Sequence, residues 1–221
     1  MVSRKYIRQI LPYKDYFIKF KKELSKSTLA KIYYVFTLIM TFEVISAKYL
    51  KAIKGGDGLY EIRIEDGGNI YRIFCCFDED NIVVLFNAFQ KKTDKTPSNE
   101  IDKAKRIMKE YFELKKRTDM NREEMKKLHL TPIEDLIEED FGKVGTPERA
   151  LFDSECDTFI IGEIIKEMRC KAGLTQEELA TKVGTKKSYI SRIENGKSDI
   201  MLNTLFRICN GLGKQMTIKF A

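Results

Sequence analysis

The sequence predicts an α+β fold, in which helices and a small antiparallel sheet form a first domain and an all-α domain follows. Three observations lead to this class. Three short apolar runs alternate with polar residues and follow one another closely in the middle of the chain. Helical periodicity comes before and after these runs. The last quarter of the chain holds short helical patterns that are separated by glycines and begin at capping residues.

The predicted sheet consists of three runs, LYEIRIE (59–65), NIYRIFCCF (69–77) and IVVLFNAF (82–89). A glycine pair separates the first two runs and DEDN separates the last two, so both connections are short turns. Short turns join antiparallel neighbours. We therefore expect a meander in which 69–77 is the middle strand.

Helices and one edge strand complete the first part of the chain. The edge strand is expected within 4–11, and helical patterning then continues to about Leu50, with interruptions at Pro12 and Ser25. After the meander, 101–117 has the spacing of a basic amphipathic helix. The first part is thus predicted as helices, a sheet and a closing helix.

Further along the chain, start and stop signals define two more helices. A short helix is expected with Pro132 near its first turn. A long helix should be capped by Thr146, with Pro147 at its first position, and should stop at Gly173. The C-terminal run QMTIKF (215–220) is a candidate short strand.

Charge divides the chain of 221 residues into three blocks. Residues 1–117 hold 24 Lys and Arg against 15 Asp and Glu, a net charge of +9. Residues 118–160 hold 5 against 12, a net charge of −7, and residues 161–221 hold 11 against 6, a net charge of +5. Each basic block is suited to bind nucleic acid, and the acidic block is suited to cover one of them.

The five cysteines are odd in number and form no CxxC pair, which argues against a disulfide framework or a zinc site. The most apolar run, 32–45, is too short to cross a bilayer and carries Glu43, so it is predicted as buried helix. With no secretory signal at its start, the chain is expected in the cytoplasm, with no membrane partner.

The sharpest motif is a helix-turn-helix in the second basic block. Thr175 caps its first helix and Glu178 completes a capping box, Gly184 makes the turn, and Asn195-Gly196 ends the second helix. With Gln176 and Ala180, this spacing resembles the phage-repressor-like (XRE) family over roughly 161–213. In that family the second helix enters the major groove of operator DNA.

The resemblance implies two kinds of DNA contact. Base edges would be read by Lys187, Ser188 and Arg192. Phosphates would be contacted by Gln176, Lys186, Asn195 and Lys197. The alternative is a helical bundle that serves only dimerisation or partner binding, against which the basic residues clustered on one helix argue.

The predicted sheet carries basic residues at Arg63, Arg72, Lys91 and Lys92, which in a meander can converge on one surface. Such a cluster can bind phosphate and stabilise a pentavalent phosphorane. The alternative is a solvated charged face. The first block has no Ser-His-Asp set and no metal ligands, and the chain's single histidine, His129, lies outside it and is interpreted as a bystander.

Together, GDGLYEIRI, YRIFCCF and LFNAFQKKTDKTPSNEIDKAKRIMKEY resemble the HigB branch of the RelE-type toxins over about 6–116. The resemblance implies a small α/β domain that cleaves mRNA in the ribosomal A site, without a metal or another cofactor. The matching catalytic positions are Arg63, Arg72, Lys91 and Lys92. The proton-transfer roles stay open, because relatives use a Tyr or His, and Tyr111 lies on an apolar helix face that favours core packing.

The acidic segment and the helix-turn-helix together resemble a HigA-type antitoxin, with a natural start at Met120. We therefore expect a RelE/HigB-like toxin domain in 1–117, a toxin-neutralising acidic arm in 118–160, and a DNA-binding domain in 161–221. Apolar residues of the arm would contact the toxin domain, namely Ile133, Leu136, Ile137, Phe141, Leu151 and Phe152.

The expected function is a toxin-antitoxin module in one chain. A ribosome-dependent mRNA endoribonuclease would be neutralised by an antitoxin that binds operator DNA as a homodimer and represses its own operon. The expected partners are mRNA on the ribosome and operator DNA. The alternative is a transcriptional regulator whose toxin-like domain is catalytically degenerate and serves only protein contact.

Overall fold

The computed structural model describes residues 6–92, 96–116 and 129–217. Its contacts divide the chain into two compact units, one within Ser3–Lys143 and one within Val144–Ala221. The first is a mixed α+β unit and the second is helical, so the predicted fold class is confirmed. The division at Lys143 lies beyond the predicted end of the toxin domain because residues 129–143 pack on the first unit.

The first unit is built on a five-stranded sheet with the order β1-β5-β4-β3-β2. The strands are β1 (Gln9–Pro12), β2 (Leu50–Ala52), β3 (Leu59–Asp66), β4 (Asn69–Phe77) and β5 (Ile82–Lys91). The antiparallel meander of β3, β4 and β5 is confirmed, with β4 in the middle. The expected edge strand is β1, which pairs parallel with β5, so the sheet is mixed rather than purely antiparallel. The additional strand β2 was missed, because three residues are too few to show a period of two.

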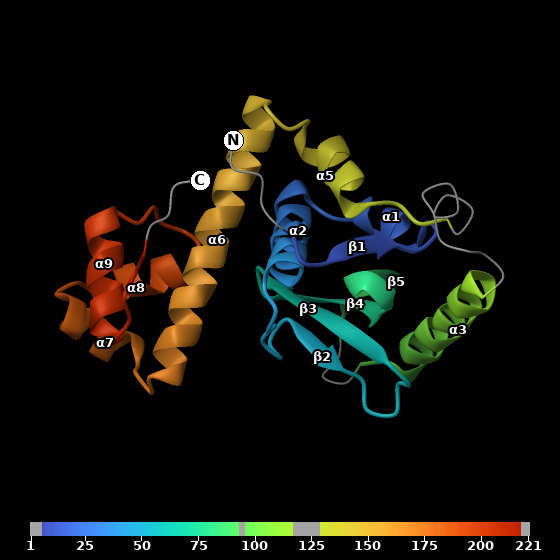
Figure 1. Ribbon diagram of the computed structural model, residues 1–221, viewed down its shortest axis with the longest axis horizontal. Coiled ribbons are helices and arrows are strands. Elements are labelled where there is room, and N and C mark those ends of the chain that lie inside the picture. Colours follow the sequence, from blue (N-terminus) through green and yellow to red (C-terminus); the bar gives the residue numbers. More distant parts are fainter. Residues whose placement is uncertain (1–5, 93–95, 117–128, 218–221) are drawn as a thin grey trace. The chain divides into compact units, whose positions relative to one another are not determined.

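Helices cover both faces of this sheet (Figure 1). They are α1 (Tyr16–Lys21), α2 (Lys26–Thr41), α3 (Ser98–Lys115) and α5 (Ile133–Phe141), with a 3-10 turn η1 at Glu79–Asn81. Ser25 caps α2 by accepting a hydrogen bond from the Thr28 amide at 3.1 Å, as its position in the sequence predicts. Among the described residues, no helix is both long and apolar enough to cross a bilayer.

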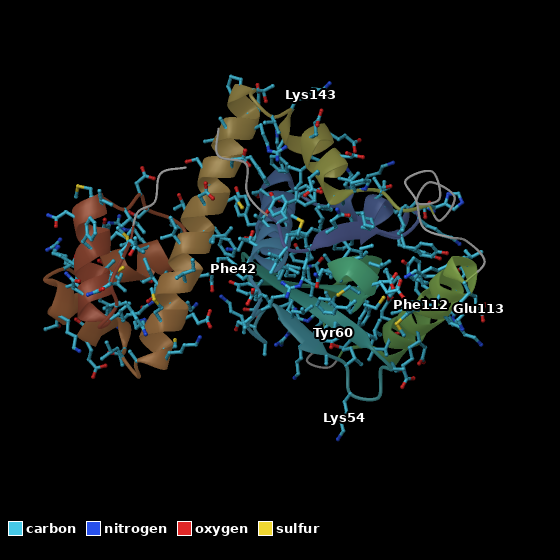
Figure 2. All side chains as sticks on the ribbon, viewed as in Figure 1. Phe42, Lys54, Tyr60, Phe112, Glu113 and Lys143 are labelled. Atoms are coloured by element: carbon cyan, nitrogen blue, oxygen red, sulfur yellow. The ribbon has the colours of Figure 1, made fainter. Side chains whose placement is uncertain are left out.

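Alternation along the strands gives each sheet face its own core. Leu59, Phe74 and Cys76 share one face, where they join a buried cluster with α3. Tyr71 and its neighbours on the other face meet α1 and α2, and the rings of Phe20 and Tyr71 lie 6.3 Å apart. Side chains fill the space between the sheet and α3, where Phe112 packs against the first cluster (Figure 2).

The second unit consists of α6 (Pro147–Lys171), α7 (Gln176–Val183), α8 (Lys187–Glu194) and α9 (Leu202–Gly211). Thr146 caps α6 and Thr175 forms the predicted capping box with Glu178. Gly184 turns the chain between α7 and α8 in the left-handed conformation, with φ of 67°. Residues 215–217 have no regular structure, and the rest of the predicted strand at 215–220 lies outside the described residues.

Close packing of α6 on α8 depends on one glycine. A Cβ atom at Gly162 would lie 2.3 Å from the carbonyl oxygen of Ile193, at the end of α8. Any side chain there would push the two helices apart. The helix that carries the predicted base-reading residues is therefore held by α6 as well as by α7.

Candidate phosphate-handling and DNA-binding sites

Arg63 and Arg72 lie directly opposite each other on β3 and β4. Their side chains point to the face of the sheet that α3 covers, because they alternate with residues of the opposite face. Two like charges in a cross-strand pair are unfavourable unless another group compensates them. The pair is therefore a site where an anion is stabilising.

The Lys91 side chain lies on the same face of the sheet as Arg63 and Arg72, and the Lys92 side chain does not. Lys91 ends β5 opposite Ile70, which is two residues from Arg72 along β4 and so on the same face. Lys92 follows the strand, is exposed, and lines a cavity of about 420 Å³ together with Phe20 and Tyr71 of the opposite face. Lys95, which belongs to the same sequence motif, lies outside the described residues.

Glu61 lies between the two arginines and was missed as a candidate. Its Oε1 is 3.5 Å from the Nε of Arg63, and its Oε2 is 3.6 Å from the Nε of Arg72. The Thr96 hydroxyl donates to Oε2 at 3.4 Å. Glu61 is 7% exposed, so its charge is held within the sheet surface and offsets the repulsion between the arginines. The available signal was the period of two, which places Glu61 and Arg63 on one face of LYEIR.

Arg72 itself is buried, with 2% of its surface exposed. Burial lowers the pKa of its guanidinium, while the Glu61 carboxylate acts in the opposite direction. Its Nη1 donates to the Tyr71 carbonyl at 2.8 Å. Among the described residues, the Nε atoms of Arg72 and Arg63 are buried and find no hydrogen-bond partner, and the Glu61 carboxylate lies 3.5–3.6 Å from them.

Tyr111 is part of the core, as its apolar helix face predicts. It is fully buried, and its hydroxyl donates to Asp78 Oδ2 at 2.6 Å, beside Lys115, whose Nζ lies 2.7 Å from Asp78 Oδ1. Burial and the hydrogen bond to Asp78 raise its pKa. Asp78 is six residues from Arg72 along the chain of β4, about 20 Å at 3.3 Å per residue. Tyr111 is therefore no proton carrier for the arginine pair.

The acidic segment docks on the first unit in two places. Leu130 forms an antiparallel bridge with Tyr13, and the Thr131 amide donates to the Pro12 carbonyl at 3.1 Å. His129 contributes its backbone carbonyl, which accepts from the Lys14 amide at 2.7 Å. These contacts lie along β1, the edge of the sheet farthest from β2.

The second docking contact joins α5 to α1 and α2. Lys21 is 6% exposed, and its Nζ lies 2.9 Å from both Glu139 and Asp140. Tyr33 of α2 donates to Asp140 at 2.6 Å, and its ring meets Phe141 edge-on at 5.9 Å. Burial alone would lower the pKa of Lys21, but its hydrogen bonds to the two carboxylates raise it. The buried ammonium is thus held charged by the acidic segment.

The predicted apolar contacts of this segment need one correction. The side chains of Ile133, Leu136, Ile137 and Phe141 are buried in the first unit. Leu151 and Phe152 belong to the second unit, where Phe152 is buried and Leu151 is 63% exposed. Leu151 is adjacent to Phe152 on α6, and neighbours on a helix point about 100° apart, so only one of them can face a core. Because α1 and α2 cover the other face, α5 leaves the face of Arg63 and Arg72 uncovered.

In the second unit, α8 presents the residues predicted to read bases. Lys187, Ser188 and Arg192 are exposed, while Ile190 and Ile193 are buried on the opposite side. Ser188 and Arg192 are one turn apart and share a face. The Arg192 guanidinium lies 5.7 Å from the centre of the Tyr189 ring, which orients it, and Tyr189 was not among the predicted residues.

The residues predicted to contact phosphate fall into two groups. Lys186 and Lys197 are exposed, as is Asn195, whose amide donates to the Ser191 carbonyl at 2.6 Å. Gln176 is half-buried, and its amide donates to Glu194 Oε2 at 2.8 Å. The structure thus gives Gln176 a partner within the protein, which the family spacing did not indicate.

Glu194 is the centre of a buried ionic network. It is fully buried and accepts from Arg169 Nε at 2.5 Å and from Arg169 Nη2 at 2.8 Å. The remaining Arg169 Nη1 donates to the Leu174 carbonyl at 2.7 Å. This network joins α6 to the end of α8 and, through Gln176, to the start of α7.

Comparison with known proteins assigns the two parts to different families. Residues 19–109 match the family described as phage derived protein Gp49-like (DUF891), which is a RelE/HigB-like toxin family. Residues 165–218 match the helix-turn-helix family.

Relatives of the second part include antitoxin HipB of Escherichia coli, at 38% identity over 58 residues, which are 26% of this chain and 66% of HipB. An uncharacterised HTH-type transcriptional regulator of Haemophilus influenzae is 34% identical over 71 residues, which are 32% of this chain and 71% of that protein. For HipB the chain spans slightly less than two thirds of the relative's length.

Two solved structures resemble the same part. The structure of a HipA-HipB-O2-O3 complex matches at 35% identity with a TM-score of 0.27, covering 28% of this chain and 89% of that chain. The controller protein C.AhdI from Aeromonas hydrophila matches at 29% identity with a TM-score of 0.27, covering 27% of this chain and 89% of that chain.

Through its C-terminal part, the chain belongs to the HTH-type transcriptional regulators. In particular, it joins a Gp49-like, toxin-type domain to a helix-turn-helix domain that resembles antitoxin HipB.

Proposed function

We propose that this chain is a toxin and its antitoxin in one polypeptide. The first unit is a metal-independent endoribonuclease that cleaves mRNA on the ribosome, and the rest inhibits it and represses the operon. The observation that carries the proposal is the buried Arg72 beside Arg63, with Nε donors unused among the described residues, in a domain that matches a toxin family. Phosphate is the ligand that such paired guanidinium groups fit.

In the proposed reaction, the mRNA 2′-oxygen attacks the adjacent phosphorus. Arg63 and Arg72 stabilise the charge that develops on the phosphorane oxygens, and Lys91 supports them from the same face. Lys92 contacts RNA outside this group, because its side chain lines a different surface. The reaction needs no group other than the protein and the RNA.

Substitution of both arginines tests this function. Residues 1–117 expressed alone should arrest growth and fragment cellular mRNA, and Arg63→Ala with Arg72→Ala should remove both effects. Loss of charge stabilisation at a phosphorane is expected to slow cleavage by at least about 10²-fold. Lys54→Ala, on the exposed loop after β2, is the matched basic control. An intact wild-type fragment that causes no arrest would support instead a regulator with a degenerate toxin domain.

The acidic segment is proposed as the inhibitor. Residues 129–143 dock on β1, α1 and α2, so this segment does not cover Arg63 and Arg72. Inhibition is then steric, since the docked segment adds bulk that the ribosomal A site does not accept. The tether keeps the segment at an effective concentration on the order of millimolar.

Operator recognition is proposed for α8, with a homodimer that binds two half-sites about one helical turn apart. Arg192→Ala should weaken binding to the specific operator by about 1–3 kcal/mol, with a smaller effect on random DNA. Lys171→Ala is the control, since that exposed lysine pairs with Glu167 on α6. Equal losses on both DNAs, measured by a titration at constant salt, would argue against base reading by Arg192.

A further inference from the structure

The proposed cleavage needs a group that takes the proton from the attacking 2′-hydroxyl. Residues 1–117 contain no histidine, and Tyr111 is fully buried and hydrogen-bonded to Asp78, away from the arginine pair. Lysine and arginine are protonated at neutral pH and are poor bases unless their pKa is strongly lowered. A carboxylate beside the phosphate-binding groups would solve this problem.

Glu61 is such a carboxylate. It shares a face with Arg63 and Arg72, and its two oxygens lie 3.5 and 3.6 Å from their Nε atoms. These distances are long for charge-assisted hydrogen bonds, which measure about 2.7–2.9 Å, so the carboxylate is attracted by both guanidinium groups without being locked by either. It therefore keeps lone pairs that can accept a proton.

We propose that Glu61 is the general base of the RNA cleavage, an inference that rests on the proposed function. A phosphate held by the outer nitrogens of Arg63 and Arg72, next to the Glu61 carboxylate that lies between them, would bring the neighbouring 2′-hydroxyl against that carboxylate. Glu61 takes the 2′ proton, the O2′–P bond forms and the P–O5′ bond breaks. The O5′ leaving group takes a proton from the Lys91 ammonium, and the proton on Glu61 returns to Lys91 through water.

This step balances without another reactant. The products are a 2′,3′-cyclic phosphate on one RNA fragment and a 5′-hydroxyl on the other. Glu61 also neutralises part of the charge of two facing arginines, which is a positioning role that a neutral glutamine does not keep. Both roles need an ionised carboxylate, but only a base takes up a proton during the reaction, so only that role gives a solvent deuterium isotope effect that Glu61→Gln removes.

The experiment uses the full-length chain and a short oligoribonucleotide in single-turnover kinetics across acidic to neutral pH. The wild-type rate should rise with pH and then level off. Glu61→Gln should lower the plateau by roughly 10²–10⁴-fold and remove the rise at acidic pH. Glu61→Asp, which keeps a carboxylate, should retain the rise with a lower plateau. Mass spectrometry should find cyclic phosphate ends.

The outcomes separate the inference from the function on which it rests. A Glu61→Gln variant within about threefold of the wild type, or one that keeps the rise at acidic pH, overturns the assignment of Glu61 while the nuclease stands. Should Glu61→Gln fail to fold by its thermal melt, Glu61→Asp decides: a wild-type plateau or a pH-independent rate overturns the assignment. If the wild-type chain leaves the free oligoribonucleotide intact, residues 1–117 are assayed on mRNA bound to ribosomes, and mRNA left intact there overturns both proposals.

Discussion

Replacement of Glu194 by alanine is expected to destabilise the helix-turn-helix unit by about 3–5 kcal/mol, because it leaves a largely buried arginine without its counterion. Arg169 donates two hydrogen bonds to Glu194, and Gln176 donates a third. All three donors would lose their acceptor in a place where water has little access. The cost is a large share of the stability of a domain of this size.

Hydrogen exchange is the appropriate measurement, because a chain with two units need not unfold in a single step. The amides of α7 and α8 should lose protection in Glu194→Ala, while those of β4 and β5 keep it. Glu167→Ala is the matched control, since that carboxylate on α6 is half exposed, pairs with Lys171, and should cost under about 1 kcal/mol. Equal protection in both variants would show that the buried network adds little to stability.

Local signals in the sequence predicted the helix-turn-helix in most of its details. The capping box of Thr175 and Glu178 and the left-handed Gly184 depend on residues close together in the chain, and both are confirmed. The contact that Gln176 makes was not predictable from such local signals. Its family position suggested a phosphate contact, but its partner Glu194 is 18 residues away, and spacing alone carries no information about such a contact.

The sheet shows the same limit. The meander was predictable because short turns join its strands, but β1 pairs with β5 across some seventy residues of sequence, which no local period reveals. The register of the strands determines which side chains lie together in the candidate site. It places Lys91 with Arg72 and puts Lys92 on another surface, although the sequence treats the two lysines as equivalent. Glu61 is recognisable as a candidate only from the strand register, which places Arg63 directly opposite Arg72.

The second large effect is expected at the docked acidic segment. Asp140→Ala should weaken the docking of α5 by about 3 kcal/mol, because Asp140 is the less exposed of the two carboxylates on buried Lys21 and also accepts from Tyr33. The exposed fraction of the Asp140 side chain is 20%, against 66% for Glu139. Hydrogen exchange in 133–141 reports the docking directly, and protection there should fall about 100-fold or more.

Glu139→Ala is the matched control on the same lysine. Both carboxylates lie 2.9 Å from the Lys21 ammonium, but water screens Glu139, so its loss should cost under about 1 kcal/mol. Equal exchange in the two variants would mean that Lys21 is satisfied by either partner, and that apolar residues such as Ile137 and Phe141 hold α5 without the buried charge.

The same pair of variants links docking to the proposed inhibition. If the docked segment restrains the toxin domain, full-length Asp140→Ala should slow growth, and full-length Glu139→Ala should grow like the wild type. Addition of Arg72→Ala to Asp140→Ala should restore growth, because the released domain then lacks the buried arginine that binds phosphate. Slow growth that persists in this double variant would mean that the undocked chain is harmful even without the buried arginine. Misfolding, and not RNA cleavage, would then be the cause.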